Sequence, residues 1–170
     1  MKFGVKTFKD RDFLMHFKDK VDFFEVMAIQ EVDYSFLREF SLPIVIHAQH
    51  ENFNINNADK IKIKENTDSI NFAINLANEY KSNKIIVHPG LLADENCSKE
   101  QAISFFKSIK DKRILIENLP MKENRLCATP EEMKMFLRET KKEFCFDINH
   151  AIDAAIYLNK DYIEFIKKFI

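Results

Sequence analysis

The sequence has little glycine and no tryptophan: its 170 residues include two glycines, four prolines and three cysteines. No glycine-rich phosphate loop follows the first expected strand, which counts against a dinucleotide-binding sheet. The patterns G-x-x-x-x-G-K-[ST], H-E-x-x-H and G-x-S-x-G are also missing. The best-known local signatures of P-loop proteins, zincin proteases and α/β-hydrolases are therefore absent from this sequence.

The few cysteines, Cys97, Cys127 and Cys145, cannot all pair and have no C-x-x-C spacing. This usage predicts a reducing, cytoplasmic environment. The start of the sequence leads straight into a strand-like segment, so no secretory signal is expected. The longest apolar stretches fall well short of the roughly 20 residues that cross a bilayer, so we expect no membrane span.

The sequence also lacks a large excess of charge of either sign, since the formal net charge is -1. There is no global attraction to nucleic acid, although a local basic face remains compatible with this value. Hydrophobic residues make up 46% and charged residues 31%, which are typical of a globular chain. The length suits one domain with a sizeable core, so residues 1–170 are predicted to form a single domain.

What the sequence does contain is an alternation of short apolar runs with amphipathic segments. Helical spacing of apolar residues predicts helices over Thr67–Tyr80, Ser98–Ile109 and Asp153–Phe169, and a further helix starting at Pro130. Ser98 and Gln101 have the form of a capping box. The predicted strands are Phe3–Phe8, Phe23–Ile29, Pro43–Gln49, Lys84–Gly90, Arg113–Leu119 and Glu143–Asn149.

Strands joined by helical crossovers predict an α/β fold with a parallel sheet, either an open doubly wound sheet or a closed barrel. Chemically active residues at the ends of successive strands favour the barrel, where sites are built from strand ends. Six units are two fewer than a (β/α)8 TIM barrel needs. We therefore expect a truncated or incomplete barrel that lacks strands seven and eight. Its open edges must be covered, for which a homo-oligomer is one candidate.

Four of the apolar runs stop abruptly at a residue able to bind a metal. Such runs are typical of strands buried on both faces, where an unpaired charge is costly. Four endings of this type predict one converging site for divalent metal. The residues are His47, His88, Glu117 and Asp147, with His150 three residues further on.

Each ending also has a plainer interpretation. His88 is followed by Pro89 and Gly90, which would stiffen and turn the strand exit, and its imidazole could simply bond to the backbone. Glu117 could pair with Arg113 or Arg125.

Other polar residues have structural places in this scheme. The Asp147–His150 segment could instead be a helix entry, with Asn149 as the N-cap of a helix over Ala151–Leu158, and this is compatible with a metal site. His16 is expected to be a structural or a surface residue of a helix and His50 to lie in a loop, neither as a site residue. Glu25 is expected to pair with Lys6 on the neighbouring strand, either as a structural buried ion pair, which we favour, or as a lower-layer support for the site.

In this order, the strand-end residues resemble the xylose isomerase-like TIM barrel superfamily (AP endonuclease family 2), which joins endonuclease IV-type enzymes to sugar isomerases and epimerases. The resemblance covers essentially the whole chain. It implies catalytic roles for Glu117 and His150, and a substrate-binding role for Asn118. The implied ligands of a divalent metal, zinc or manganese and alternatively magnesium or cobalt, are His47, His88, Glu117, Asp147 and His150, with Glu117 as the candidate bridge.

The resemblance leaves three functions open. Two strand-end histidines, the second followed by Pro-Gly, look like the endonuclease branch, which implies hydrolysis of phosphodiesters beside abasic sites in DNA. The alternative is an isomerase or epimerase acting on a small sugar or sugar phosphate. A second alternative is a degenerate, non-catalytic barrel, because both enzyme branches take further ligands from strands seven and eight.

Overall fold

The computed structural model describes residues 1–122 and 124–170. It contains one parallel sheet of six strands whose spatial order follows the sequence. The strands are β1 (Gly4–Thr7), β2 (Phe23–Ala28), β3 (Ile44–Ala48), β4 (Ile85–Val87), β5 (Ile114–Glu117) and β6 (Glu143–Cys145). The helices are α1 (Arg11–Phe17), η1 (Ser35–Glu39), η2 (Glu51–Phe53), α2 (Ile63–Glu79), α3 (Lys99–Ser108), α4 (Pro130–Thr140), α5 (Ile148–Tyr157) and α6 (Tyr162–Lys167).

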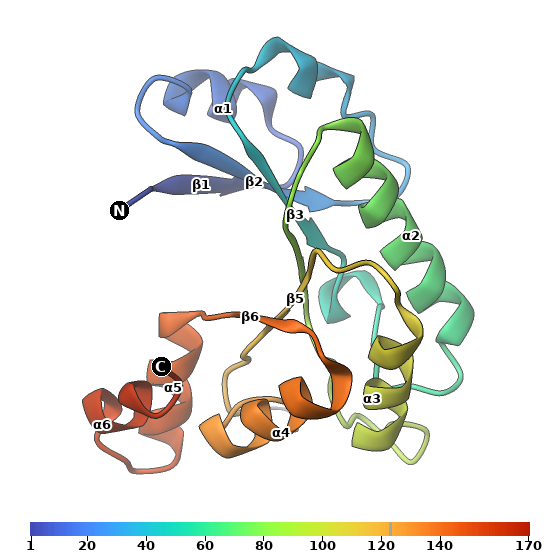
Figure 1. Ribbon diagram of the computed structural model, residues 1–170, viewed down its shortest axis with the longest axis vertical. Helices are drawn as coiled ribbons and strands as arrows, with labels where there is room; N and C mark the ends of the chain where they lie inside the picture. Colours follow the sequence, from blue (N-terminus) through green and yellow to red (C-terminus); the bar gives the residue numbers. More distant parts are fainter. Residues whose placement is uncertain (123) are drawn as a thin grey trace.

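The strands follow one another round an arc, with the helices on its outer side (Figure 1). The two edge strands, β1 and β6, lie on either side of the opening of the arc, where both termini are also found. Every strand pair is parallel and is joined through helical material, as the alternating sequence predicted. The α/β prediction of a partial TIM barrel is thus confirmed.

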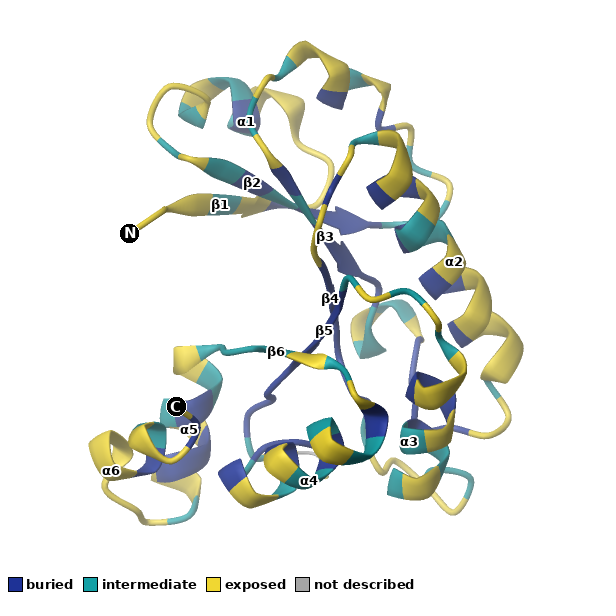
Figure 2. Ribbon diagram, in the orientation of Figure 1, coloured by how far each residue is buried: buried dark blue, intermediate teal, exposed yellow. Residues whose placement is uncertain are grey.

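The core lies between the outer face of the sheet and the helices, where Figure 2 shows buried residues on both layers. Side chains alternate along each strand, so Ile46, Ile85 and Ile114 face the helices. On the helices, small and aromatic residues such as Ala73 and Phe106 pack against them. Because side chains alternate along a strand and one set is buried against the helices, the other set must point to the inside of the arc.

The strand register brings the expected site residues to one rim. His47 is paired with Ile86 in the ladder, and Ile86 with Leu115. His88 and Glu117 each lie two residues further along the same face of their strands, so they are level with each other. The predicted convergence at the carboxyl ends of the strands follows directly from this register.

The exit of β4 is shaped by Gly90, which has a φ of 110°. A Cβ atom there would lie 2.6 Å from Asn56 Oδ1 and 2.8 Å from the Ala58 nitrogen. Asn56 holds the same turn by donating to the Leu91 carbonyl at 2.9 Å and accepting from its N–H at 3.0 Å. The glycine after His88-Pro89 therefore meets both a conformational and a steric requirement.

The edge strands are less buried than the sequence suggested. Phe144 and Cys145 of β6 are only partly buried, although the run was expected to be covered on both faces. The cause is that β6 has a neighbour on one side only. The Lys6–Glu25 ion pair forms at 2.9 Å, but with 40% and 21% of the side chains exposed it is not the buried pair expected.

The C-terminal helix prediction is wrong in its bounds, because two helices replace the single helix over Asp153–Phe169. Asn159 adopts a left-handed φ of 51° and ends α5, and Asp161 caps α6 by accepting from the Glu164 N–H at 2.9 Å. The N-cap of α5 is Asp147, whose carboxylate accepts from the His150 N–H at 2.9 Å, so the assignment of this role to Asn149 is also wrong.

Smaller differences concern element ends: β6 stops at Cys145 instead of Asn149, and α2 begins at Ile63, before Thr67. Ser98 caps α3 as expected, accepting from the Gln101 N–H at 3.0 Å. Within the described ranges, we find no helix with the length and apolar character needed to cross a membrane.

Candidate metal centre

Three side chains from neighbouring strand ends meet at one point inside the arc. The Nε2 atoms of His47 and His88 each lie 3.1 Å from the same oxygen, Oε2 of Glu117. All three residues are buried, at 1%, 8% and 7% exposure. The residues predicted from β3, β4 and β5 are therefore brought together.

The ring of His47 is held in one orientation by its other nitrogen. Its Nδ1 lies 2.8 Å from the carbonyl oxygen of Ala48, an acceptor, so Nδ1 carries the proton. In the neutral ring, Nε2 then presents a lone pair to the Glu117 carboxylate. A lone pair and a carboxylate oxygen attract each other only when a proton or a metal cation lies between them.

The pKa shifts of Glu117 and His88 agree with a proton or a metal cation between the carboxylate and the imidazoles. Burial alone would raise the pKa of Glu117, but hydrogen bonds with His47 and His88 outweigh burial and hold the pKa well below its usual range. Burial alone would lower the pKa of His88, but hydrogen bonds to Glu117 and Glu51 outweigh it and raise the pKa. The Glu117 carboxylate is thus ionised, and a positive charge beside it is favourable.

The donor set fits a divalent metal. Two imidazole nitrogens and one carboxylate oxygen are ligands of catalytic zinc sites, which keep a further position open. Tetrahedral bonds of about 2.0–2.1 Å place neighbouring ligand atoms roughly 3.3 Å apart. The observed 3.1 Å separations lie close to that value. His47, His88 and Glu117 could therefore hold one ion after small shifts.

A second group begins at the other oxygen of Glu117. Oε1 lies 3.8 Å from Nδ1 of His150, which lies 3.8 Å from Oδ2 of Asp147. The ligand atoms of Glu117, Asp147 and His150 fall within 4.8 Å of one another. Both side chains from beyond β6 are partly exposed, and His150 Nδ1 is engaged with the Asn118 carbonyl at 2.8 Å. This group is therefore a second candidate ion position, with longer separations and more exposure than the first.

Asn118 is fully buried, and both ends of its amide bind the backbone of Asp147. Its Nδ2 donates to the Asp147 carbonyl at 2.8 Å, and its Oδ1 accepts from the Asp147 N–H at 2.7 Å. These contacts support a role in positioning the Asp147–His150 turn. Direct substrate binding by this amide, as the resemblance implied, would require breaking them.

His50 and Glu51 stand at the same rim, although neither was expected there. The His50 ring stacks on that of His88 with centroids 4.5 Å apart, and Glu51 Oε2 lies 3.0 Å from His88 Nδ1. Burial chiefly lowers the pKa of His50. The only sequence signal was a histidine and a glutamate just after the His47 strand, in a segment without periodicity.

The alternative partners considered for Glu117 are used elsewhere. Arg113 binds Asp111 at 2.6 Å, and Arg125 binds Glu51 at 3.1 Å. His16 lies exposed on α1, 3.1 Å from Lys20, as a surface residue.

Comparison with known families gives a match over residues 11–169 to the model of the xylose isomerase-like TIM barrel. The chain belongs to this family. No curated protein sequence matches it.

Several solved structures share the fold of this chain at low identity. A D-tagatose 3-epimerase-like protein is 23% identical, with a TM-score of 0.75, over 99% of this chain and 71% of the other. Endonuclease IV from Thermus thermophilus is 16% identical, with a TM-score of 0.74, over the same shares. A further Thermus thermophilus protein, soaked with ZnCl2, is 16% identical, with a TM-score of 0.62, over 88% and 68%. Both branches thus lie equally near in fold.

Proposed function

We propose that the protein is a divalent-metal-dependent enzyme of this family, with hydrolysis of phosphodiesters, as by an AP endonuclease, as the leading activity. The observation that carries the proposal is the division of the Glu117 carboxylate. One oxygen meets His47 and His88 at 3.1 Å, and the other faces His150 at 3.8 Å. One carboxylate is placed to serve two adjacent ion positions.

Divalent ions at such adjacent positions would neutralise charge that develops on a phosphoryl group during an in-line displacement. The protein's own contribution is positional. Burial of His47 and Glu117 keeps water from competing with them, and Ala48 fixes the tautomer of His47. Zinc and manganese are the ions that we expect, with magnesium or cobalt as alternatives. Imidazole ligands suit zinc, whereas carboxylate ligands suit manganese and magnesium.

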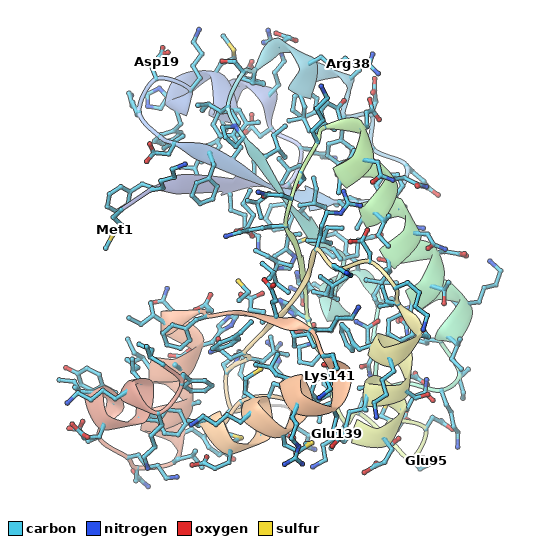
Figure 3. The ribbon with its side chains drawn as sticks, viewed as in Figure 1. Met1, Asp19, Arg38, Glu95, Glu139 and Lys141 are labelled. Atoms are coloured by element: carbon cyan, nitrogen blue, oxygen red, sulfur yellow. The ribbon has the colours of Figure 1, made fainter. Side chains whose placement is uncertain are left out.

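The abasic-site substrate can be tested with duplex DNA carrying one such site, incubated with the protein and zinc or manganese. We expect a single incision at the site, which E117Q abolishes. The variant E95Q is a matched control, because Glu95 is an exposed side chain on the outer surface (Figure 3). An intact duplex under every metal, with metal bound to the protein, would contradict this activity.

A second candidate is epimerisation or isomerisation of a small sugar or sugar phosphate. It is supported by the higher identity, 23%, to the D-tagatose 3-epimerase-like protein and by a net charge of -1, which offers DNA no general attraction. Here Glu117 or His150 would move a proton at a carbon next to a carbonyl group. Exchange of that proton in deuterated water, measured over a panel of ketoses, would identify it.

The non-catalytic alternative predicts no stoichiometric metal, so metal analysis of the purified protein separates it from both enzymes. The cytoplasmic location and a homo-oligomer covering the barrel edges stay predictions.

A further inference from the structure

We propose that Glu51 is a positioning residue of the metal centre, which keeps the His88 ring aimed at Glu117. This inference rests on the proposed function, because it concerns the same centre. Glu51 comes from the short helix η2, which follows β3, and not from a strand end. The side chain of Glu51 is 12% exposed, and that of His88 is 10% exposed.

The carboxylate of Glu51 has three partners, of which His50 is the most distant, with its Nδ1 3.6 Å from Oε2. Oε2 lies 3.0 Å from Nδ1 of His88, and Oε1 lies 3.1 Å from Nη2 of Arg125. The carboxylate therefore accepts the Nδ1–H of His88 on one side and is held by a guanidinium on the other. With Nδ1 protonated, the lone pair of the neutral His88 ring belongs to Nε2, the atom that faces Glu117.

The two histidines of the centre are oriented by different means. His47 donates its Nδ1–H to the Ala48 backbone carbonyl, which every sequence would supply. His88 donates to a side-chain carboxylate. A carboxylate behind the imidazole makes the ring a stronger metal ligand as well as fixing its tautomer. The affinity of the centre should therefore depend on Glu51.

The same atoms could instead be interpreted as a separate ion site, since His50, Glu51 and His88 also lie within 4.8 Å of one another. Two observations speak against this. A metal lies in the plane of each imidazole that binds it, but the His50 and His88 rings are stacked, 20° from parallel and 4.5 Å apart. In addition, the Arg125 guanidinium already neutralises Glu51, which disfavours a dication beside it.

The local sequence explains how Glu51 reaches this place. His50 has extended backbone and caps η2, and Asn54 ends it in a left-handed conformation with a φ of 61°. This single turn points Glu51 inward beside His88, while the stacked His50 ring covers the face of His88. Packing and hydrogen bonding thus restrict the His88 ring together.

The test is zinc affinity, measured by competition with a chromophoric chelator, with the number of bound ions measured by elemental analysis. We expect E51Q to weaken zinc binding by about 10–100-fold while the number of ions stays unchanged, and the control E95Q to match the wild type. Cobalt absorption spectra should show that E51Q alters the geometry around the ion. If E51Q does not fold, R125Q, which releases Glu51, should weaken zinc binding by a smaller factor.

Each other outcome is decisive. Unchanged affinity in E51Q, or in R125Q where that variant replaces it, overturns the positioning role alone. Loss of one whole ion in E51Q would show that Glu51 is a ligand and overturns it too. A wild-type protein that binds no zinc, manganese, magnesium or cobalt overturns the proposed function and the inference together.

Discussion

The centre and the edge of the sheet carry site residues of the same chemical types but hold them differently. At the centre, β3, β4 and β5 each have a neighbour on both sides. His47, His88 and Glu117 are buried there, and the Nε2 atom of each histidine lies 3.1 Å from Glu117 Oε2. At the edge, Asp147 and His150 follow β6, are 29% and 25% exposed and lie 3.8 Å apart. Two-sided support therefore gives a prepared site, and one-sided support a loose one.

Loss of Glu117 should have the largest effect, because it is the one residue shared by both regions. We expect E117Q to weaken zinc binding by more than about 100-fold, the upper range for loss of a supporting residue alone. Both ion positions should be affected, as measured by chelator competition. Wild-type affinity in E117Q would show that the carboxylate is not a ligand and would remove the link between centre and edge.

The next largest effect is expected from a comparison of a histidine at the centre of the sheet with a histidine at its edge. H88A should abolish the tightest ion, because it removes one of three converging donors. H150A should leave that ion bound and weaken a second, looser one. Titration of both variants with zinc and manganese checks this order. Equal losses in the two variants would mean that the centre is no better prepared than the edge.

Substitution of the two glycines compares the centre and the edge of the sheet by their contribution to the free energy of unfolding. In G90A, a Cβ would meet Asn56 and backbone at a positive φ, so we expect a loss of about 1–3 kcal/mol in the free energy of unfolding. The melting temperature would fall by roughly 2–12 °C for a chain of this size.

In G4A at the edge, the three atoms nearest to the new Cβ would all belong to the Phe23 ring, a partly buried side chain that can turn aside. We expect G4A to lower the free energy of unfolding by less than about 1 kcal/mol. Thermal melts of the metal-free proteins measure both. A costlier G4A would mean that β1 is packed as tightly as β4.

The smallest effect concerns the Lys6–Glu25 pair. Because the two side chains are 40% and 21% exposed, a double-mutant cycle with K6M and E25Q should give a coupling of about 0.2–1 kcal/mol. A coupling of several kcal/mol would show that the pair is shielded from water in solution.

Much of this contrast could be predicted from the sequence, and the remainder depends on contacts that local patterns do not record. Apolar runs ending at His47, His88 and Glu117 indicated both the parallel strands and the shared rim, because burial and strand direction determine them. The role of Asp147 as N-cap was missed because a capping carboxylate and a ligand carboxylate look alike in sequence. Glu51 was missed because a single turn of η2, without periodicity, brings it beside a strand 37 residues away.

The burial of the edge strand β6 was overestimated for a related reason. Phe144 and Phe146 form an apolar run like those of the central strands, but the run does not show whether a neighbour lies on both sides. The break between α5 and α6 depends on the left-handed conformation of Asn159, a conformation that the residue type permits but does not require.

The most direct test of the central claim is a crystal structure of the protein grown with zinc, with anomalous diffraction recorded at the zinc absorption edge. We predict a peak within about 2.0–2.2 Å of His47 Nε2, His88 Nε2 and Glu117 Oε2, stronger than any peak beside Asp147 and His150. Absence of a peak between His47, His88 and Glu117, or a stronger peak at the edge, would contradict the account.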